Sequence, residues 1–283
     1  MKRRIRLSLQ RLIGNLFEGI FASSMNALHG MELDELRQYQ PGDDIRAVDW
    51  KTTIKTGILH VRMKLVDKRV TVLFLIDRSW SGKFGTFQKT KEDVQADVLS
   101  ILVHAASETG NEIGFVTFTD TVENYIKPKS GEKEALKNIR NILLEKTSGT
   151  NTDLNVAFKF INEKHFSPAL VFVISDFLAP CNYEQSLKTL SSVHEVIPVI
   201  ISDRTETYLP AGKGLVAMQN IETGQVRLLD ISHALHESLP CLALLKKLAI
   251  DHLALSTEQD EEIWIKKISE FFDRRIRRRG RRR

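Results

Sequence analysis

The sequence predicts an α/β protein with a doubly wound, mostly parallel sheet, a small accessory N-terminal segment and a β-hairpin insertion. Two observations predict this fold class. Short apolar runs typical of fully buried strands alternate with amphipathic helical patterns along most of the chain. Several of these runs end in a carboxylate or a hydroxyl, and in open α/β sheets ligands bind at the carboxyl ends of the strands.

The individual elements follow from these patterns. Apolar runs predict strands at 70–76, 113–118, 122–126, 169–175, 193–201 and 252–255, with a half-exposed strand at 58–66. Apolar residues at helical spacing predict helices at 87–108, 131–144, 152–164, 239–248 and 260–276. The runs 215–218 and 226–229 flank a turn at 222–224 and predict the hairpin.

These elements divide the chain into three parts. Residues 1–66 form an N-terminal helix and accessory segment, 67–272 form the main domain with an insertion at about 204–232, and 273–283 form an arginine-rich tail. We expect the accessory segment to pack with the hairpin.

Composition narrows the class of protein. An apolar content of 42% and a charged content of 27% over 283 residues are ordinary for a globular chain. No uncharged apolar run approaches the ~18–20 residues of a membrane helix, and no signal-peptide pattern is present. Cys181 and Cys241 are isolated, which favours reduced thiols in the cytoplasm.

The net charge of +5 comes from the two ends of the chain. Residues 1–17 carry five basic and no acidic side chains, and the segment between the two ends is net acidic. The apolar stripe in residues 2–21 is compatible with a helix on an anionic membrane, at the membrane's inner face, but we favour a helix docked on the protein. The tail arginines are candidate ligands for phosphates of lipid, RNA or a partner protein: Arg274, Arg275, Arg277, Arg278, Arg279, Arg281, Arg282 and Arg283.

Polar side chains gather at predicted strand ends and at one helix start. Asp77, Ser79 and Ser81 follow the first buried strand, and Asp176 follows a later one, directly after Ser175. Thr152 and Asp153 precede a predicted helix, where either residue alone could act as a cap; alone, Asp176 could be an ordinary loop residue. Side chains that offer only oxygen donors suit Mg²⁺, with Mn²⁺ or Ca²⁺ as other candidates. Taken together, the residues favour a metal site: Asp77, Ser79, Ser81, Thr152 and Asp176, with Asp153 and Ser175 as secondary candidates.

Several enzyme classes are disfavoured. The sequence has no G-x-x-x-x-G-K-[ST] loop and no H-E-x-x-H motif. A phosphohydrolase of the haloacid dehalogenase type would have aspartate at position 79, where this chain has serine. No histidine lies close in sequence to Ser79 or Ser81 as a general base. We therefore expect a binding protein, with anionic-surface binding through the basic termini as the alternative function.

On these motifs the sequence resembles von Willebrand factor A-like proteins, and more closely the bacterial domain-of-unknown-function 58 family. The closer resemblance rests on R-x-Y-x-x-G-D-D-x-R-x-x-D-W at 37–50, G-x-L-x-V-R at 57–62, D-x-S-x-S at 77–81, T-D at 152–153 and S-D-F at 175–177. For the block 39–50 we favour a structural role, in which Trp50 buries its indole and ties the segment to the sheet.

The resemblance implies a magnesium-binding sheet with a metal-ion-dependent adhesion site. In such a site the hydroxyls of Ser79, Ser81 and Thr152 would touch the ion, while Asp77 and Asp176 would act through bound waters. The resemblance also implies a partner, a MoxR-type AAA+ ATPase, and a role in assembling or activating a client protein. Contact with an anionic membrane is a further expectation, and nucleic acid is less favoured.

Overall fold

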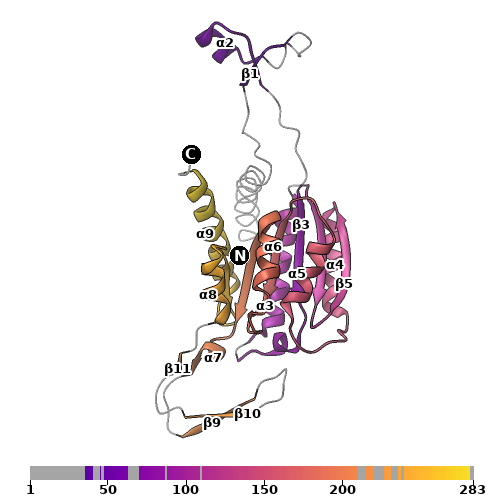
Figure 1. Ribbon diagram of the computed structural model, residues 1–283, viewed down its shortest axis with the longest axis vertical. Coiled ribbons are helices and arrows are strands. Elements are labelled where there is room, and N and C mark those ends of the chain that lie inside the picture. The colour runs from indigo at the N-terminus through magenta and orange to yellow at the C-terminus, as the bar shows by residue number, and fades with distance from the viewer. Residues whose placement is uncertain are drawn as a thin grey trace.

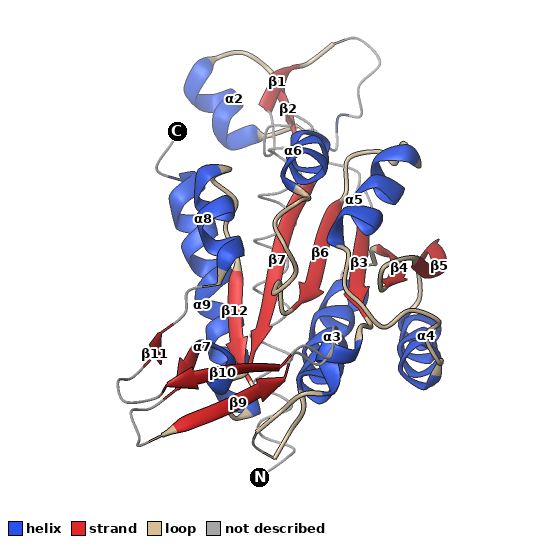
Figure 2. Ribbon diagram, turned by 60° about the horizontal axis from the view of Figure 1, so that its bottom comes forward, coloured by secondary structure: helices blue, strands red, loops and turns tan. Residues whose placement is uncertain are grey.

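The computed structural model describes residues 36–40, 45, 48–62, 70–86, 88–108, 110–209, 214–219, 226–230, 235–236 and 239–280. At its centre is a six-stranded sheet with the order β12-β7-β6-β3-β4-β5 (Figure 2). The strands are β3 (Thr71–Asp77), β4 (Glu112–Phe118), β5 (Val122–Lys129), β6 (Leu170–Ser175), β7 (Glu195–Ser202) and β12 (Leu253–Ser256). All neighbours are parallel except β4 and β5. The predicted fold class is confirmed.

Helices cover both faces of this sheet. The helices α3 (Lys91–Glu108), α4 (Glu132–Leu144) and α9 (Glu261–Gly280) contribute to one hydrophobic core. The helices α5 (Leu154–Glu163), α6 (Glu184–Val193) and α8 (Pro240–Lys247) contribute to the other. Alternate residues of β3 supply the two cores, with Phe74 in the first and Leu73 and Leu75 in the second. Burial on both faces explains why this strand is a continuous apolar run.

Of the helices that cover the sheet, α3, α6 and α9 differ most from the prediction. The helix α3 begins at Lys91 rather than at 87, because Thr90 and Asp93 exchange capping hydrogen bonds of 2.9 Å and 3.2 Å. The helix α6 was not predicted, although Leu187 and Leu190 are spaced for a buried helical face. The helix α9 continues to Gly280, beyond the predicted end at 276.

Residues before the sheet form a small unit of β1 (Leu36–Gln38), α2 (Trp50–Thr56) and β2 (His60–Arg62). The strands pair antiparallel, and residues 63–66 of the predicted strand lie outside the described residues. Asp49 caps α2 by accepting a 2.9 Å hydrogen bond from the Thr52 amide, and Gly57 ends the helix at a φ of 73°. Trp50 is 59% exposed, so the expectation of a buried indole is wrong. As the first residue of α2, it is on a helix with no buried side chain.

The insertion after β7 contains the predicted hairpin. It begins with α7 (Arg204–Thr207), after which β8 (Tyr208–Leu209) pairs with β11 (Leu235–His236). Between them, β9 (Leu215–Gln219) and β10 (Val226–Asp230) pair antiparallel. Figures 1 and 2 show this hairpin and the β1–α2–β2 unit at opposite ends of the molecule. The expectation that the two pack together is therefore wrong.

No helix in the described part of the chain combines the length and the apolar character needed to cross a membrane.

Candidate functional site

The loop after β3 brings three predicted site residues together. Asp77 is the last residue of the strand, and the 3-10 helix η2 (Trp80–Lys83) follows immediately. The Ser79 amide donates a 3.0 Å hydrogen bond to Asp77 Oδ1. The tight turn of η2 then places the hydroxyls of Ser79 and Ser81 3.0 Å apart. The D-x-S-x-S spacing thus gathers one carboxylate and two hydroxyls at the strand end.

The end of β6 adds two more predicted residues. Because β6 is the parallel neighbour of β3, Ser175 and Asp176 reach the same edge of the sheet. The Ser175 hydroxyl donates a 2.6 Å hydrogen bond to Asp77 Oδ2. The side-chain amide of Gln95, on α3, donates to the Asp77 carbonyl at 2.9 Å and to the Ile174 carbonyl at 3.2 Å. Gln95 therefore ties the two strand ends together beneath the site.

A small cavity of about 20 Å³ lies at this edge of the sheet, and its lining includes Asp77, Ser79, Ser81 and Asp176. Its other lining residues among those described are Gly82, Lys91, Gln95, Ser175 and Ile201. A volume of this size is enough for about one water molecule or one ion. Among the described residues, no group of three or more His, Cys, Asp and Glu side chains could hold a metal. Any cation here would therefore need the serine hydroxyls as well as the two carboxylates.

Lys91 is a member of this site that sequence reasoning missed. Its side chain is only 3% exposed, and its ammonium lies 2.6 Å from Asp176 Oδ2 and 2.5 Å from Glu206 Oε1. Burial acts to lower the pKa of Lys91, but the charges of Asp176 and Glu206 raise it above its ordinary value. The ammonium therefore stays charged, as an internal cation beside the cavity.

Asp77 has an unusual protonation equilibrium. Burial, followed by the charge of Asp176, raises the pKa of Asp77 from 3.8 to about 7, although hydrogen bonds from Ser175 and Ser79 oppose the shift. A cation in the cavity would favour the ionised form of this carboxyl. The donor set, two carboxylates and two hydroxyls, fits a hard divalent cation of the Mg²⁺ type.

Thr152 and Asp153 lie in the loop before α5 and are not among the described residues that line the cavity. Asp153 is the N-cap of α5 and accepts a 2.9 Å hydrogen bond from the Asn155 amide. The structure thus shows Asp153 as a helix cap, which was one of two interpretations of this residue from the sequence, the other being a secondary metal ligand. The Trp80 amide donates a 3.0 Å hydrogen bond to the Thr150 carbonyl, which ties the Thr152 loop to η2. Thr152 is therefore near the site but outside the cavity lining.

Glu123, on β5, fixes the position of that loop. Its carboxylate accepts hydrogen bonds from the Ser148 amide at 3.0 Å, the Ser148 hydroxyl at 2.7 Å and the Gly149 amide at 2.8 Å. The Thr119 hydroxyl adds a fourth at 2.6 Å. Burial acts to raise the pKa of Glu123, but these hydrogen bonds lower it to about 2. A side chain at Gly149 would clash with Thr119 and Asp120, so the loop needs glycine there.

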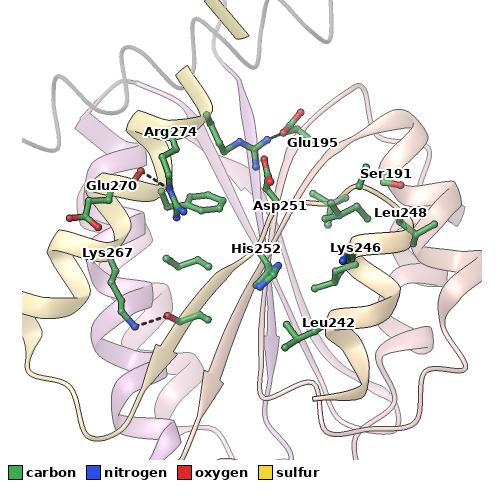
Figure 3. Close-up of a pocket in the computed structure, with 18 of the residues that line it drawn as sticks. Ser191, Glu195, Leu242, Lys246, Leu248, Asp251, His252, Lys267, Glu270 and Arg274 are labelled. Atoms are coloured by element: carbon green, nitrogen blue, oxygen red, sulfur yellow. Dashed lines mark hydrogen bonds and ion pairs between the residues drawn. The ribbon is translucent and has the colours of Figure 1, made fainter. Parts of the chain in front are cut away.

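The tail arginines are partly built into the fold. Arg275 forms an ion pair with Glu195 and stacks over the Phe271 ring, 5.5 Å from its centroid. Arg274 Nε donates a 3.3 Å hydrogen bond to the Glu270 carbonyl. These residues border a groove of about 1660 Å³ between α8 and α9, whose rim carries charges of both signs (Figure 3). Residues 281–283 lie outside the described residues, as do residues 1–35 with the predicted N-terminal helix.

Comparison with known proteins gives a family match. Residues 35–239 match the family described as "Protein of unknown function DUF58". Uncharacterized proteins of Mycobacterium tuberculosis and Mycobacterium bovis are each 30% identical over 210 residues, which are 74% of this chain and 66% of theirs. The chain thus spans just under two thirds of the length of these relatives.

Solved structures with a similar chain path were also found. The protein BatB from Bacteroides thetaiotaomicron has a TM-score of 0.49 at 13% identity, covering 74% of this chain and 99% of its own. The SpRpn10 VWA domain has a TM-score of 0.43 at 11% identity, covering 73% and 95%. A proximal thread matrix protein from the mussel byssus, described as having a zinc-occupied MIDAS motif, has a TM-score of 0.39 at 16% identity, covering 50% and 40%.

Proposed function

Since this chain belongs to the DUF58 family of proteins of unknown function, we propose that it is a non-enzymatic adaptor that binds a partner protein through a divalent cation. The observation that supports this most is the cavity of about 20 Å³, whose lining includes the oxygen-bearing residues Asp77, Ser79, Ser81 and Asp176. Oxygen-only donors favour Mg²⁺, with Mn²⁺ and Ca²⁺ as the alternatives.

The residues have distinct roles in this proposal. Ser79 and Ser81 hold the ion through their hydroxyls, while Asp77 and Asp176 balance its charge. Ser175 and the Ser79 amide orient the Asp77 carboxylate through the two hydrogen bonds that they donate to it. The bound ion supplies a coordination position that a carboxylate of the partner can complete. Thr152 completes the donor set if its loop closes over the cavity.

A binding role suits the site better than a catalytic one. The cavity lining among the described residues contains hydroxyls and carboxylates but no histidine to serve as a general base for Ser79 or Ser81. Lys91, the one cationic side chain among the described lining residues, is paired with two carboxylates.

Magnesium binding is the first prediction. Calorimetric titration of the purified protein with MgCl₂ should detect binding, and Ser79→Ala should weaken it about tenfold or more because a donor is lost. Thr152→Ala should weaken it less, since Thr152 lies outside the cavity lining. The matched control is Ser100→Ala, which removes a hydroxyl that donates a hydrogen bond to the Ala96 carbonyl within α3. Equal affinity of the wild-type and Ser79→Ala proteins would show that the site is assigned to the wrong residues.

The proposed partner is a MoxR-type AAA+ ATPase in the cytoplasm, acting with this chain on a client protein. Affinity capture from native lysate with magnesium should recover such an ATPase with the wild-type protein. Ser79→Ala or added chelator should abolish its recovery, because the partner's carboxylate would lack its ion. Recovery of the ATPase that is unaffected by either change would contradict the metal-dependent contact. Recovery dominated by nucleic acid would favour binding through the basic termini instead.

A further inference from the structure

Lys91 connects the cavity to the insertion that follows β7. It is the first residue of α3, and its ammonium bridges Asp176 at the end of β6 and Glu206 in α7. The exposed fractions of the three side chains are 3%, 5% and 14%. A buried ammonium without a paired carboxylate destabilises the fold strongly. We therefore expect the Lys91 ammonium to stay next to whichever carboxylates are available to pair with it.

We propose that Lys91 acts as the internal counter-ion of the metal cavity. In the metal-free protein its ammonium pairs with both Asp176 and Glu206. When a divalent cation binds Asp176, the ammonium pairs with Glu206 alone. This rests on the proposed function, since it assumes that a cation enters the cavity. The two cations compete for one carboxylate, because Lys91 already lies 2.6 Å from Asp176 Oδ2. Asp176 Oδ1 in turn accepts a 3.1 Å hydrogen bond from the Leu178 amide.

Glu206 makes this exchange possible without leaving Lys91 unpaired. Its Oε1 atom contacts Lys91, while its Oε2 atom accepts a 3.1 Å hydrogen bond from the Asp203 amide in a capping box. The capping box holds the carboxylate in place whether or not Asp176 shares the ammonium. Glu206 lies in α7, which leads directly into β8. The exchange of ion-pair partners therefore changes the contacts at the start of the insertion that carries the β9–β10 hairpin. Figure 1 shows α7 and this hairpin at one end of the sheet.

The proposal gives two substitutions opposite effects on magnesium affinity. Lys91→Met removes the competing cation and should strengthen binding about tenfold or more, because a like charge near the ion is lost. Glu206→Gln removes the second partner of Lys91 and should weaken binding about tenfold, since a bound ion would then leave the ammonium unpaired. The matched control is Lys89→Met, two positions from Lys91 in the chain. It removes a half-exposed ammonium that pairs with Asp97 and should change affinity less than about twofold.

The double variant separates this exchange from a simple change in local charge. If Glu206 acts through Lys91, Glu206→Gln should have little effect on magnesium affinity in a Lys91→Met background. If it acts only through its own charge, the two effects should add, and the proposal is wrong. Hydrogen–deuterium exchange provides a second measurement: magnesium should alter exchange at 204–208 in the wild-type protein but not in Lys91→Met.

Further results of the magnesium titrations distinguish failure of the Lys91 proposal from failure of the proposed function. Lys91→Arg keeps the charge and should bind magnesium more weakly than Lys91→Met, which tests the proposal with a variant that retains the ion pairs. If the magnesium affinity of Lys91→Met is equal to or lower than that of the wild-type protein, the counter-ion role is wrong. Binding by Lys91→Met but not by the wild-type protein would support that role and contradict metal-dependent binding in the native chain. Absence of binding in both proteins would contradict the proposed function, and the proposal with it.

Discussion

Replacing Asp203 with alanine should lower the free energy of unfolding by about 3–5 kcal/mol, because it removes the centre of a buried, charged hydrogen-bond network. Asp203 is fully buried at the end of β7. Its carboxylate accepts hydrogen bonds from the Thr86 amide and hydroxyl at 2.9 and 2.7 Å, and from the Thr257 hydroxyl at 2.7 Å. The Thr205 amide and hydroxyl add two more, at 3.0 and 2.7 Å. One side chain thus joins loops that follow β3, β7 and β12.

The same carboxylate should make stability depend on pH in a defined direction. Burial acts to raise the pKa of Asp203, but the hydrogen bonds from Thr86, Thr205 and Thr257 hold it well below its ordinary value. A group with a depressed native pKa stabilises the fold above its unfolded pKa of about 3.9, and this contribution is lost as the pH falls further. Asp203→Asn should therefore reduce stability at pH 7 and lose much of that difference in strong acid.

Urea denaturation followed by circular dichroism at several pH values would measure both effects. Asp273→Asn is the matched control, since Asp273 is an exposed aspartate on α9 and its loss should change stability by less than about 0.5 kcal/mol. A loss below about 1 kcal/mol for Asp203→Ala would mean that water replaces the carboxylate in this network. A difference between the wild-type protein and Asp203→Asn that is constant from neutral to acid pH would contradict the assigned pKa shift.

The sheet and most of its helices could be predicted because burial on two faces imposes a simple pattern. A strand such as β3 must be apolar where both of its faces are buried, at residues 72–76, and the parallel arrangement then places Asp77 and Asp176 at the same edge. The D-x-S-x-S spacing predicted the convergence of Ser79 and Ser81, because a tight turn after a strand leaves few alternatives. Local sequence therefore determined the part of the site that lies directly on strand ends.

The ion-pair network could not be predicted from local sequence. A lysine at the start of a helix is normally solvated, and nothing near Lys91 in the chain indicates that Asp176 and Glu206, 85 and 115 residues away, enclose it. The network around Asp203 was similarly hidden, since Thr86 and Thr257 are 117 and 54 residues away from it in the chain. These contacts depend on tertiary packing around the strand ends.

Two other features, the helix α2 and the exposure of Trp50, differ from the prediction although the local sequence indicates them. Asp49 and Gly57 bracket a helix of seven residues with the usual capping residues at both ends, yet the apolar pattern predicts no helix there. Trp50 is expected to be buried, whereas it is the first residue of a seven-residue helix with no buried side chain and is itself exposed. A large aromatic side chain is therefore not buried unless the helix that carries it packs into the core.

Replacing Phe74 with alanine should have an effect of similar size to Asp203→Ala, but through the apolar core. Phe74 is fully buried in the central strand β3, with its ring stacked between Phe115 and Phe172 at centroid distances of 5.7 and 5.2 Å. Loss of the ring leaves a cavity between three strands, so the free energy of unfolding should fall by about 3–5 kcal/mol. Leu144→Ala, at a position that is 73% exposed, is the control and should cost less than about 0.5 kcal/mol.

Urea denaturation at pH 7 would measure this loss, and magnesium titration of the folded variant would show whether it reaches the site. Phe74 belongs to the core formed with α3, α4 and α9, whereas Asp77, three residues later in the same strand, is held by hydrogen bonds from Ser79 and Ser175. The folded Phe74→Ala protein should therefore keep its magnesium affinity within about threefold, since additivity holds for sites without shared partners. A loss below about 1.5 kcal/mol would mean that neighbouring rings collapse into the space. A large loss of metal affinity would mean that the position of the strand end depends on core packing as well as on these hydrogen bonds.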